Sequence, residues 1–427
     1  MSLAVIGCGK MGLPIAVQAA SRGLDVTGVD INEDLVAAIN RGESPIDEPG
    51  INNLLSDAVK SGKLKATVNL SDAVSRVNAI IVIVPVLLTD SKQADLGTIK
   101  AVTSGISRAM KPGAVVSYET TLPIGTTRNI LQPLLEESGL KAEKDFYLVY
   151  SPERVKSLLV MDRLNKVPKV VGGAGPLSLE KGMKLYSAIL KSELISVGTL
   201  EKAEMVKLAG MIYRDVNIAL ANELSRYCDN VGINLSEIIP FVNTDGEAHL
   251  LQPGIGVGGH CTPVYPYFLI NDARQKGVSQ SLAETARKIN DGQAEYVLQR
   301  LKILSGNIEG LKILLLGLGF RPDVKEDTES SAYLIRKAVE KHGAECFLYD
   351  PFYSADEISG RGFVYHDLNS PDHIDAVILV TAHTLFLKLD WKRLREKGVR
   401  SFIDGRNCFK KDDLEEAGIK YAGIGSG

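Results

Sequence analysis

The chain has few cysteines, and they follow no paired pattern. Its 427 residues include five, Cys8, Cys228, Cys261, Cys346 and Cys408, and none has the CxxC spacing of a redox or zinc motif. An odd number at scattered positions argues against a disulfide framework and favours a reducing compartment. We therefore predict a cytoplasmic protein without a metal site.

Long hydrophobic runs and an excess of one charge are also missing. The longest apolar run, Ala79–Leu88, is about half of the roughly 20 residues that a membrane span needs, and Pro85 interrupts it. Lys and Arg number 49 against 52 Asp and Glu, a formal charge of −3, so the average charge gives no reason to expect nucleic acid. The sequence predicts neither membrane nor nucleic acid as a partner, and small anionic ligands stay open.

What the sequence does contain is an alternation of short β-branched runs with helix-length segments. This alternation favours parallel sheets that helices cover on both faces. The candidate strands are Leu3–Gly7, Asp25–Asp30, Ala79–Val84, Ala114–Tyr118, Phe146–Tyr150, Lys169–Gly172, Lys312–Leu316, Cys346–Tyr349, Ala376–Val380 and Ser401–Ile403.

The first candidate strand leads directly into the GxGxxG turn Gly7–Gly12. In such a turn the first glycine permits the bend, the second lets the backbone approach a pyrophosphate, and the third lets the helix pack on the sheet. The helix N-terminus adds free N–H groups and positive potential. Asp30 ends the next strand, at the spacing of the acid that binds the adenosine ribose and repels a 2′-phosphate. The motif predicts an NAD site formed by Gly7, Gly9, Lys10, Met11, Gly12 and Asp30.

A long helical pattern, Glu201–Val231, separates the two α/β regions. A helix of about 45 Å exceeds what one compact domain usually needs, so it would bridge two domains or form a dimer seam. We predict an α/β fold of two Rossmann-like domains with parallel sheets, joined by a central helical region. The predicted domains are residues 1–198, 199–304 and 305–427. The second glycine pair, Gly317 and Gly319, lacks a third glycine and is predicted to be a plain turn.

A second glycine-rich stretch, Gly254–Gly259, leads to His260 and Cys261. Glycines let a backbone fold closely around a ligand and present N–H groups to it. A cysteine after such a loop can be a nucleophile if a nearby cation favours its thiolate, but most cysteines are small buried apolar groups. His260 would serve as the base or only hold the loop. The residues alone leave both alternatives open.

A series of sequence blocks spans nearly the whole chain: Glu119–Thr127, Ser151–Val155, Ala203–Ala209, Tyr213–Ala219, Asn222–Leu224, Gln252–Cys261, Gly319–Asp323 and Asp404–Asn407. Together they resemble the UDP-glucose/GDP-mannose dehydrogenase family of nucleotide-sugar 6-dehydrogenases. The resemblance is closest to the branch acting on UDP-N-acetylmannosamine or UDP-N-acetylglucosamine. The branch is inferred from Ser151–Val155 and Tyr213–Ala219, where the glucose enzymes carry different blocks, including an added glutamate that would fall at Ser157.

The resemblance implies NAD-dependent oxidation of the C6 hydroxyl of a UDP-N-acetylhexosamine to a uronic acid. It implies that Lys207 stabilises the oxyanions and that Cys261 traps the aldehyde as a thiohemiacetal, which is oxidised to a thioester and hydrolysed. The resemblance also implies that Thr121 and Pro85 lie at the cofactor and that Thr121 holds the water. It implies that Glu153 is a proton acceptor. The residues implied for substrate binding are Arg154, Val155, Lys207, Arg214, Gly258, Arg321 and Arg406. We expect a homodimer through the central helix.

Several positions depart from the family pattern: Met211, Tyr265, Glu247, Thr328 and the turn Val84–Leu87. Met211 stands where the family has an asparagine that shares the oxyanion, and the loss of one such donor costs on the order of 10²–10³ in turnover. Tyr265 replaces an aspartate, and Glu247 and Thr328 replace arginines. Two alternatives therefore stay open. One is altered redox chemistry on another nucleotide sugar, such as a single oxidation or an epimerisation, and the other is a degenerate paralogue that only binds nucleotide sugar.

Overall fold

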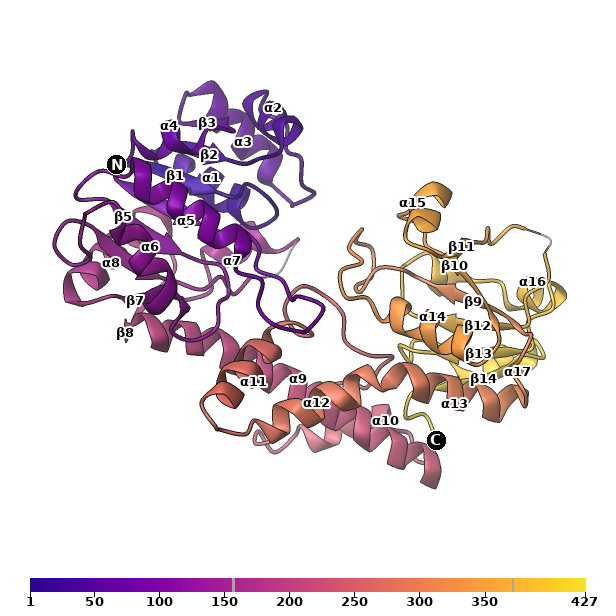
Figure 1. Cartoon of the computed structure of the whole chain (residues 1–427). Helices are drawn as coiled ribbons and strands as arrows, with labels where there is room; N and C mark the ends of the chain where they lie inside the picture. The colour runs from indigo at the N-terminus through magenta and orange to yellow at the C-terminus, as the bar shows by residue number, and fades with distance from the viewer. Residues whose placement is uncertain (156–157, 371) are drawn as a thin grey trace. The chain divides into compact units, whose positions relative to one another are not determined.

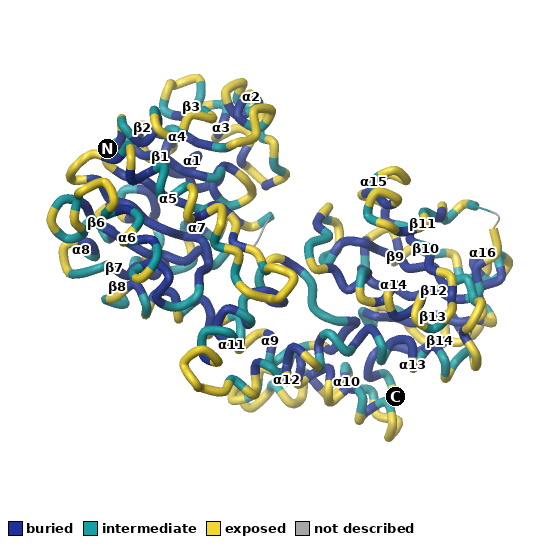
Figure 2. The backbone as a smooth tube through the Cα atoms, viewed as in Figure 1, coloured by how far each residue is buried: buried dark blue, intermediate teal, exposed yellow. Residues whose placement is uncertain are grey.

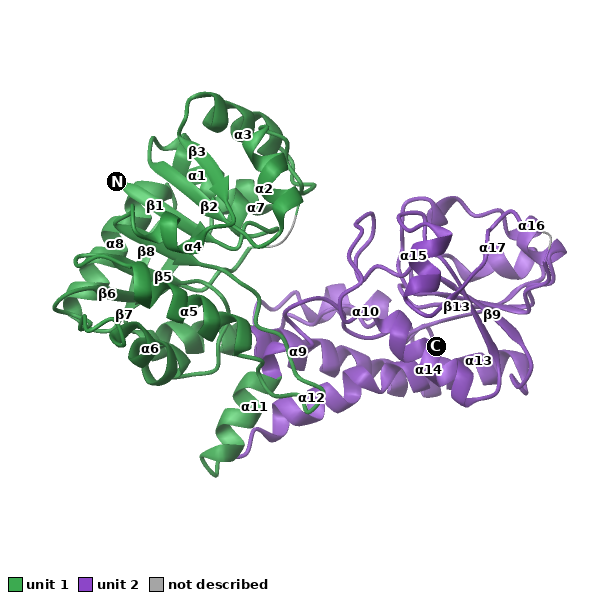
Figure 3. Cartoon of the chain, turned by 45° about the horizontal axis from the view of Figure 1, so that its top comes forward, with its two compact units in different colours: residues 1–210, 267–278 green, residues 211–266, 279–427 purple. Residues whose placement is uncertain are grey.

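The computed structural model describes residues 1–155, 158–370 and 372–427, so Ser157 lies outside the described residues. The chain forms two compact units (Figure 3). Unit 1 comprises Met1–Gly210 and Tyr267–Val278, and unit 2 comprises Met211–Pro266 and Ser279–Gly427. Each unit is built around one sheet (Figure 1).

The sheet of unit 1 has eight strands in the order β3-β2-β1-β4-β5-β6-β7-β8. Neighbouring strands are parallel, except that β6 and β7 pair antiparallel. The sequence predicts all of these strands but β3 and β8. Their bounds are β1 Ser2–Ile6, β2 Asp25–Val29, β3 Leu64–Thr67, β4 Ala79–Val82, β5 Val115–Tyr118, β6 Tyr147–Tyr150, β7 Lys169–Gly173 and β8 Leu194–Thr199.

Helices cover both faces of this sheet. Successive side chains of a strand point to opposite faces, and β5 shows where they go: Ser117 hydrogen-bonds the Tyr186 hydroxyl of α8, whereas the Tyr118 hydroxyl bonds Thr103 of α5. The central strands, β1 and β4 to β7, are almost fully buried (Figure 2). The helices are α1 Gly12–Ser21, α2 Glu33–Asn40, α3 Ile51–Lys60, α4 Leu70–Val74, α5 Gly97–Ala109, the π-helical turn η1 Thr127–Leu131, α6 Gln132–Glu136, α7 Val160–Leu164 and α8 Pro176–Ile189.

The sheet of unit 2 has six parallel strands in the order β11-β10-β9-β12-β13-β14. In β9, Ile313 and Leu315 pack on one face of the sheet with α13 and α14, and Leu314 and Leu316 pack on the other with η2, α16 and α17. The bounds are β9 Lys312–Leu316, β10 Glu345–Tyr349, β11 Val364–Tyr365, β12 Ala376–Leu379, β13 Ser401–Asp404, β14 Lys420–Gly423, α13 Gln293–Ser305, α14 Ser331–Lys341, α15 Ala355–Gly360, η2 Phe386–Lys388, α16 Trp391–Glu396 and α17 Lys411–Glu416.

The predicted long helix is confirmed as α9, Leu200–Val231, of 32 residues. It continues from unit 1 into unit 2 at Gly210 and Met211, and it ends before Gly232, whose φ of +73° glycine adopts without strain. No helix in the described part of the chain is long and apolar enough to cross a membrane. The remaining helices are α10 Leu235–Val242, α11 Tyr265–Gln275 and α12 Ser281–Asp291.

The two sheets repeat the same central strand order, β2-β1-β4-β5 in unit 1 and β10-β9-β12-β13 in unit 2. In each, the order reverses beside the first strand, and ligands of such sheets bind at the carboxyl ends of the strands at this point. The predicted fold class is confirmed. The three predicted domains stay a prediction, and the contacts within the chain divide it into two units.

Candidate functional site

The turn after β1 has a backbone that requires glycine. Gly7 has a φ of +92°, and its N–H donates to the carbonyl oxygen of Val29 at 2.8 Å. A Cβ on Gly12 would collide with the carbonyl oxygen of Gly7, so α1 starts close to the strand. A Cβ on Gly9, by contrast, would meet no heavy atom within 4 Å. Gly9 therefore leaves open space beside the N-terminus of α1, where a pyrophosphate fits.

Asp30 follows β2 and supports this turn. Its Oδ2 accepts from the N–H of Cys8 at 2.8 Å, and its Oδ1 accepts from the N–H of Asn32 at 3.0 Å. A carboxylate has further lone pairs, so the half-buried Asp30 can still accept from ribose hydroxyls. Lys10 is exposed and Met11 half-buried in the same turn. These residues fit NAD.

The loops after β4 and β5 meet at the same edge of the sheet. Thr120 Oγ1 donates to the carbonyl oxygen of Val84 at 2.5 Å, and the Tyr150 hydroxyl donates to the carbonyl oxygen of Thr120 at 3.0 Å. Pro85 is exposed and Thr121 is buried. The structure thus places both predicted cofactor residues on connected segments at the carboxyl ends of parallel strands.

Lys207 lies buried on α9, and its ammonium donates to the main-chain oxygen of Glu153 at 2.7 Å. One turn earlier, Glu204 accepts from the N–H of Gly125 at 2.5 Å, and from the N–H and hydroxyl of Thr127 at 3.0 and 2.6 Å. Burial raises the pKa of Glu204 to about 7, although these bonds lower it. The first turns of α9 therefore hold the loops that follow both β5 and β6.

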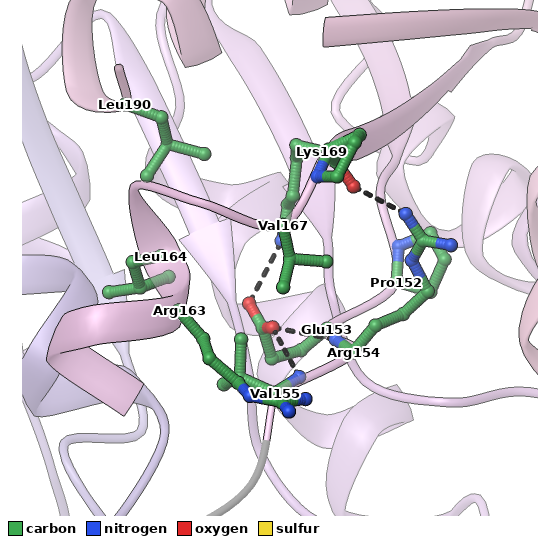
Figure 4. A pocket seen from close by; sticks show the side chains of 10 residues that line it. Pro152, Glu153, Arg154, Val155, Arg163, Leu164, Val167, Lys169 and Leu190 are labelled. Carbon is green, nitrogen blue, oxygen red and sulfur yellow. Dashed lines mark hydrogen bonds and ion pairs between the residues drawn. The ribbon is translucent and has the colours of Figure 1, made fainter. Parts of the chain in front are cut away.

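Both oxygens of the Glu153 carboxylate have partners (Figure 4). Its Oε1 accepts from the N–H groups of Arg154 and Val155 at 2.6 and 3.0 Å, and its Oε2 pairs with the Lys169 ammonium at 3.0 Å. Burial raises the pKa of Glu153, but the charge of Lys169 and these hydrogen bonds outweigh burial and lower it. Glu153 is therefore ionised at neutral pH.

Lys169 is not among the site residues predicted from the sequence. The signal was present, because a lysine at the start of an apolar strand needs a partner when it is buried. The guanidinium of Arg154 donates to the carbonyl oxygen of Pro168, directly before Lys169. Glu153, Arg154, Val155 and Lys169 line a cavity of about 10 Å³, which is roughly the space of one water, so this cavity holds no sugar.

In unit 2 the glycine loop is held through its main chain. Gly254 donates its N–H to Asn222 at 2.9 Å and accepts from the amide of Gln293 at 2.7 Å, and Gly259 donates to the carbonyl oxygen of Thr328 at 2.8 Å. Cys261, at the end of the loop, is half-buried. Thr328 contacts Gly259 only through its main-chain oxygen. This hydrogen bond therefore does not depend on the side chain at position 328, where the family has an arginine. Sequence analysis also misses Gln293.

Three of the predicted substrate residues of unit 2, Gly258, Arg321 and Arg406, belong to this loop or to segments next to it. A Cβ on Gly258 would come within 2.6 Å of the Cβ of Phe320, the neighbour of Arg321. Arg406 donates through Nε to the carbonyl oxygen of Val380 at 2.7 Å, and a Cβ on Gly254 would lie 3.5 Å from its NH1. Burial lowers the pKa of Arg406. The glycine loop therefore lies next to Phe320–Arg321 and next to Arg406.

The turn after β9 repeats the turn after β1. Gly317 has a φ of +98° and donates to the carbonyl oxygen of Tyr349 at 2.9 Å, and Leu318 donates to Asp350 Oδ2 at 2.6 Å. Asp350 thus takes the place that Asp30 has in unit 1. The hydrogen bonds of the two turns are alike, although the next helix begins only at Ser331, and the predicted plain turn stays a prediction.

The other predicted residues are more scattered. Arg214 is exposed and Met211 half-buried on α9, and Glu247 is exposed in the loop after α10. Tyr265 begins α11, and its N–H donates to the carbonyl oxygen of Cys261 at 2.9 Å. Lys207 belongs to unit 1, whereas Cys261, Arg214, Arg321 and Arg406 belong to unit 2.

The fold and the glycine turn with its acid define a dinucleotide-binding protein. Models of the UDP-glucose/GDP-mannose dehydrogenase family match residues 1–190 with the NAD binding domain, 201–292 with the central domain and 314–411 with the UDP binding domain. The chain therefore belongs to this family. Membership confirms the resemblance, the NAD cofactor and the class of NAD-dependent nucleotide-sugar dehydrogenase.

Individual relatives match over the whole chain. The NDP-N-acetyl-D-galactosaminuronic acid dehydrogenase of Ralstonia nicotianae is 34% identical over 417 residues, 96% of each chain. The UDP-N-acetyl-D-mannosamine dehydrogenase of Pyrococcus horikoshii is 32% identical over 435 residues, 100% of each chain. The solved structure of a UDP-D-ManNAc dehydrogenase from Pyrococcus horikoshii covers 100% of both chains with a TM-score of 0.90 and 31% identity.

Proposed function

We propose that this enzyme oxidises the C6 hydroxyl of a UDP-N-acetylhexosamine to the uronic acid, with NAD as the acceptor. The substrate class is supported by relatives that are named for N-acetylmannosamine and N-acetylgalactosaminuronic acid and match the chain end to end. The observation that carries the proposal is the buried ammonium of Lys207, held at 2.7 Å by the main-chain oxygen of Glu153. A fixed cation of this kind stabilises an alkoxide at low reorganisation cost.

The proposed reaction has two oxidations. Bound NAD would supply the acceptor for the hydride that leaves C6 in each. Lys207 stabilises the alkoxide that forms when the hydroxyl loses its proton, with Glu153 as the proton acceptor. The Cys261 thiolate adds to the resulting aldehyde, the second hydride leaves the thiohemiacetal, and water held by Thr121 hydrolyses the thioester and frees the thiol.

The residues assigned to the substrate fall into two groups. We assign Arg154, Val155 and Lys207 to the sugar, with Arg214 nearby, and Gly258, Arg321 and Arg406 to the UDP portion. Arginines suit a diphosphate because their planar donors match its oxygens. The UDP binding domain that the family model identifies, residues 314–411, contains Arg321 and Arg406.

We further propose a cytoplasmic homodimer that forms through α9. Apolar side chains on this helix are exposed at a spacing of three, four and seven residues, which is typical of a helix packing seam. Their exposed fractions are 61% for Tyr213, 48% for Leu220, 36% for Leu224, 65% for Tyr227 and 47% for Val231. The predicted domains 1–198, 199–304 and 305–427 would place this seam in the central domain.

The departures from the family pattern support a second candidate, a single or transient oxidation. Met211 cannot donate a hydrogen bond to an oxyanion, and Tyr265 has no carboxylate. Both would weaken the second oxidation more than the binding of nucleotide sugar. A degenerate paralogue that binds without turnover is the limiting case.

NADH yield separates these functions. The purified protein is incubated with excess NAD and a limiting amount of each UDP-sugar, and NADH is measured by absorbance while the product is identified by mass spectrometry. Two NADH per uronic acid supports the proposal. One NADH, or a product without NADH, supports the second candidate, and tight binding without product supports the paralogue.

A further inference from the structure

Lys169 is a buried cation between two buried carboxylates. Its ammonium lies 2.6 Å from Oε2 of Glu119 and 3.0 Å from Oε2 of Glu153, and its side chain is 7% exposed. Glu119 follows β5, Glu153 follows β6 and Lys169 begins β7, so the cluster joins three neighbouring strands. A buried ion is tolerated when it is paired, and here one ammonium serves two carboxylates.

Aromatic and hydroxyl groups complete the cluster. The Tyr186 hydroxyl donates to Oε1 of Glu119 at 2.8 Å, and its ring lies 5.2 Å from the Lys169 ammonium. Ser117 bonds the same hydroxyl at 2.8 Å. Since these partners come from β5 and α8, the position of Lys169 is fixed by the body of unit 1 rather than by the loop that carries Glu153.

The peptide between Glu153 and Arg154 connects this cluster to Lys207. Its N–H donates to Oε1 of Glu153 at 2.6 Å, and its C=O accepts from the Lys207 ammonium at 2.7 Å. In a trans peptide the N–H and C=O point in opposite directions, so a carboxylate that orients the N–H also orients the C=O. The Glu153 side chain, which Lys169 holds, therefore sets the direction of the Glu153 main-chain oxygen, to which Lys207 donates.

We propose that Lys169 is a positioning residue for Lys207: by pairing with Glu119 and Glu153 together, it orients the Glu153–Arg154 peptide that holds the Lys207 ammonium. This inference rests on the proposed function, in which Lys207 stabilises the oxyanion. Without Lys169 two carboxylates would face each other with no cation between them. Burial already raises the pKa of Glu119 to about 7, so Glu119 would take up a proton first. The Glu153 carboxylate would then lose its anchor, and the peptide would be free to turn.

The kinetic test compares Lys169→Met, Lys169→Arg, Lys207→Met and Lys169→Met/Lys207→Met. We expect Lys169→Met to lower kcat by roughly 10- to 100-fold, because a misplaced catalytic group costs about this much, and to change KM for NAD by less than about threefold. Lys169→Arg retains most of kcat, since a guanidinium also binds two carboxylates. The double variant is no slower than Lys207→Met, because residues that act through one another are not additive. Additive losses, or an unchanged kcat in Lys169→Met, overturn the proposal.

The matched control is Lys184→Met on α8, which removes a lysine from an exposed ion pair with Glu180 at 2.6 Å and should leave kcat unchanged. If Lys169→Met does not fold, Glu119→Gln/Lys169→Met replaces it, since it removes one charge of each sign. Crystal structures supply a readout independent of turnover. The distance from Lys207 Nζ to the Glu153 oxygen is kept in Lys169→Arg and lost in Lys169→Met, and its preservation in Lys169→Met refutes the proposal. If that distance changes as expected but the wild type oxidises no UDP-sugar, only the proposed function fails.

Discussion

The carboxylate of Glu204, near the start of α9, accepts a hydrogen bond from the main-chain N–H of Gly125 at 2.5 Å. The same side chain accepts two bonds from Thr127, so a single buried group closes the loop that begins with Thr121 onto the helix that carries Lys207. A carboxylate suits this place because it has only acceptors, and three donors point at it. Burial nevertheless makes its charge costly and raises its pKa to about 7.

This cost predicts a pH-dependent stability. The folded pKa of Glu204 lies above its ordinary value of 4.5, so its contribution to stability is full below that value and is lost as pH rises to about 7. The difference between this folded pKa and the ordinary value corresponds to about 3 kcal/mol of stability. Glu204→Gln cannot ionise, so the free energy of unfolding of the wild type should fall, relative to the variant, between pH 5 and 7. Urea unfolding at intervals across this range measures the difference. Parallel curves would contradict the raised pKa.

The two glycines of the first turn should respond in opposite ways to alanine. A Cβ on Gly12 collides with the backbone of Gly7, which cannot move without breaking the turn, so Gly12→Ala should destabilise the protein by about 3 kcal/mol. A Cβ on Gly9 meets nothing within 4 Å, so Gly9→Ala should change stability by less than about 0.5 kcal/mol. Gly9→Ala should instead weaken NAD binding by roughly tenfold or more, because the methyl group occupies the approach of the pyrophosphate.

Each glycine variant serves as the control for the other. Thermal unfolding without cofactor gives the stability, and a fluorescence titration with NADH gives the affinity. If Gly9→Ala binds NADH as tightly as the wild type, the pyrophosphate does not lie beside Gly9.

Features encoded by neighbouring residues were predictable from the sequence. The turn Gly7–Gly12 and the acid Asp30 follow strands whose apolar runs are plain, and α9 has an uninterrupted helical pattern. The strands β3 and β8 were not predictable in this way. Leu64–Thr67 has only two buried side chains among its four residues, and no residue of Leu194–Thr199 is buried, because each strand lies at an edge of the sheet.

The supports of the site were also hidden in the sequence, for a different reason. Lys169 meets Glu119 across 50 positions of the chain, and Gln293 meets Gly254 across 39. Neither residue belongs to a local motif, and only the strand order β5-β6-β7 brings the first pair together. A sequence pattern therefore identifies the residues that take part in the chemistry more readily than the residues that position them.

The exposed apolar stripe of α9 predicts the state of association. Leu220→Glu/Leu224→Glu places two charges in the proposed seam. Because a buried unpaired charge is strongly unfavourable, the dissociation constant of the dimer should rise by at least about 100-fold. Sedimentation velocity over a range of concentrations measures this. Ile303→Glu is the matched control, because Ile303 is 75% exposed on α13, outside the stripe. A wild type that sediments as a monomer, or a double variant that still dimerises, contradicts the seam.

Cys261 should be required for the second oxidation and not for the fold. Cys261→Ser removes the thiol that would form the thioester but keeps the size of the side chain, so we expect uronic acid formation to fall by roughly 10³-fold or more. Thermal stability and NADH affinity should not change, since the glycine loop is held by Asn222, Gln293 and Thr328 through its backbone. Cys408→Ser, at an exposed cysteine, is the control and should retain full activity. The uronic acid is measured by mass spectrometry, and the first turnover of NADH by stopped flow. An unchanged acid yield in Cys261→Ser would remove the thiol from the mechanism, because no other group in the proposed sequence can carry the acyl intermediate.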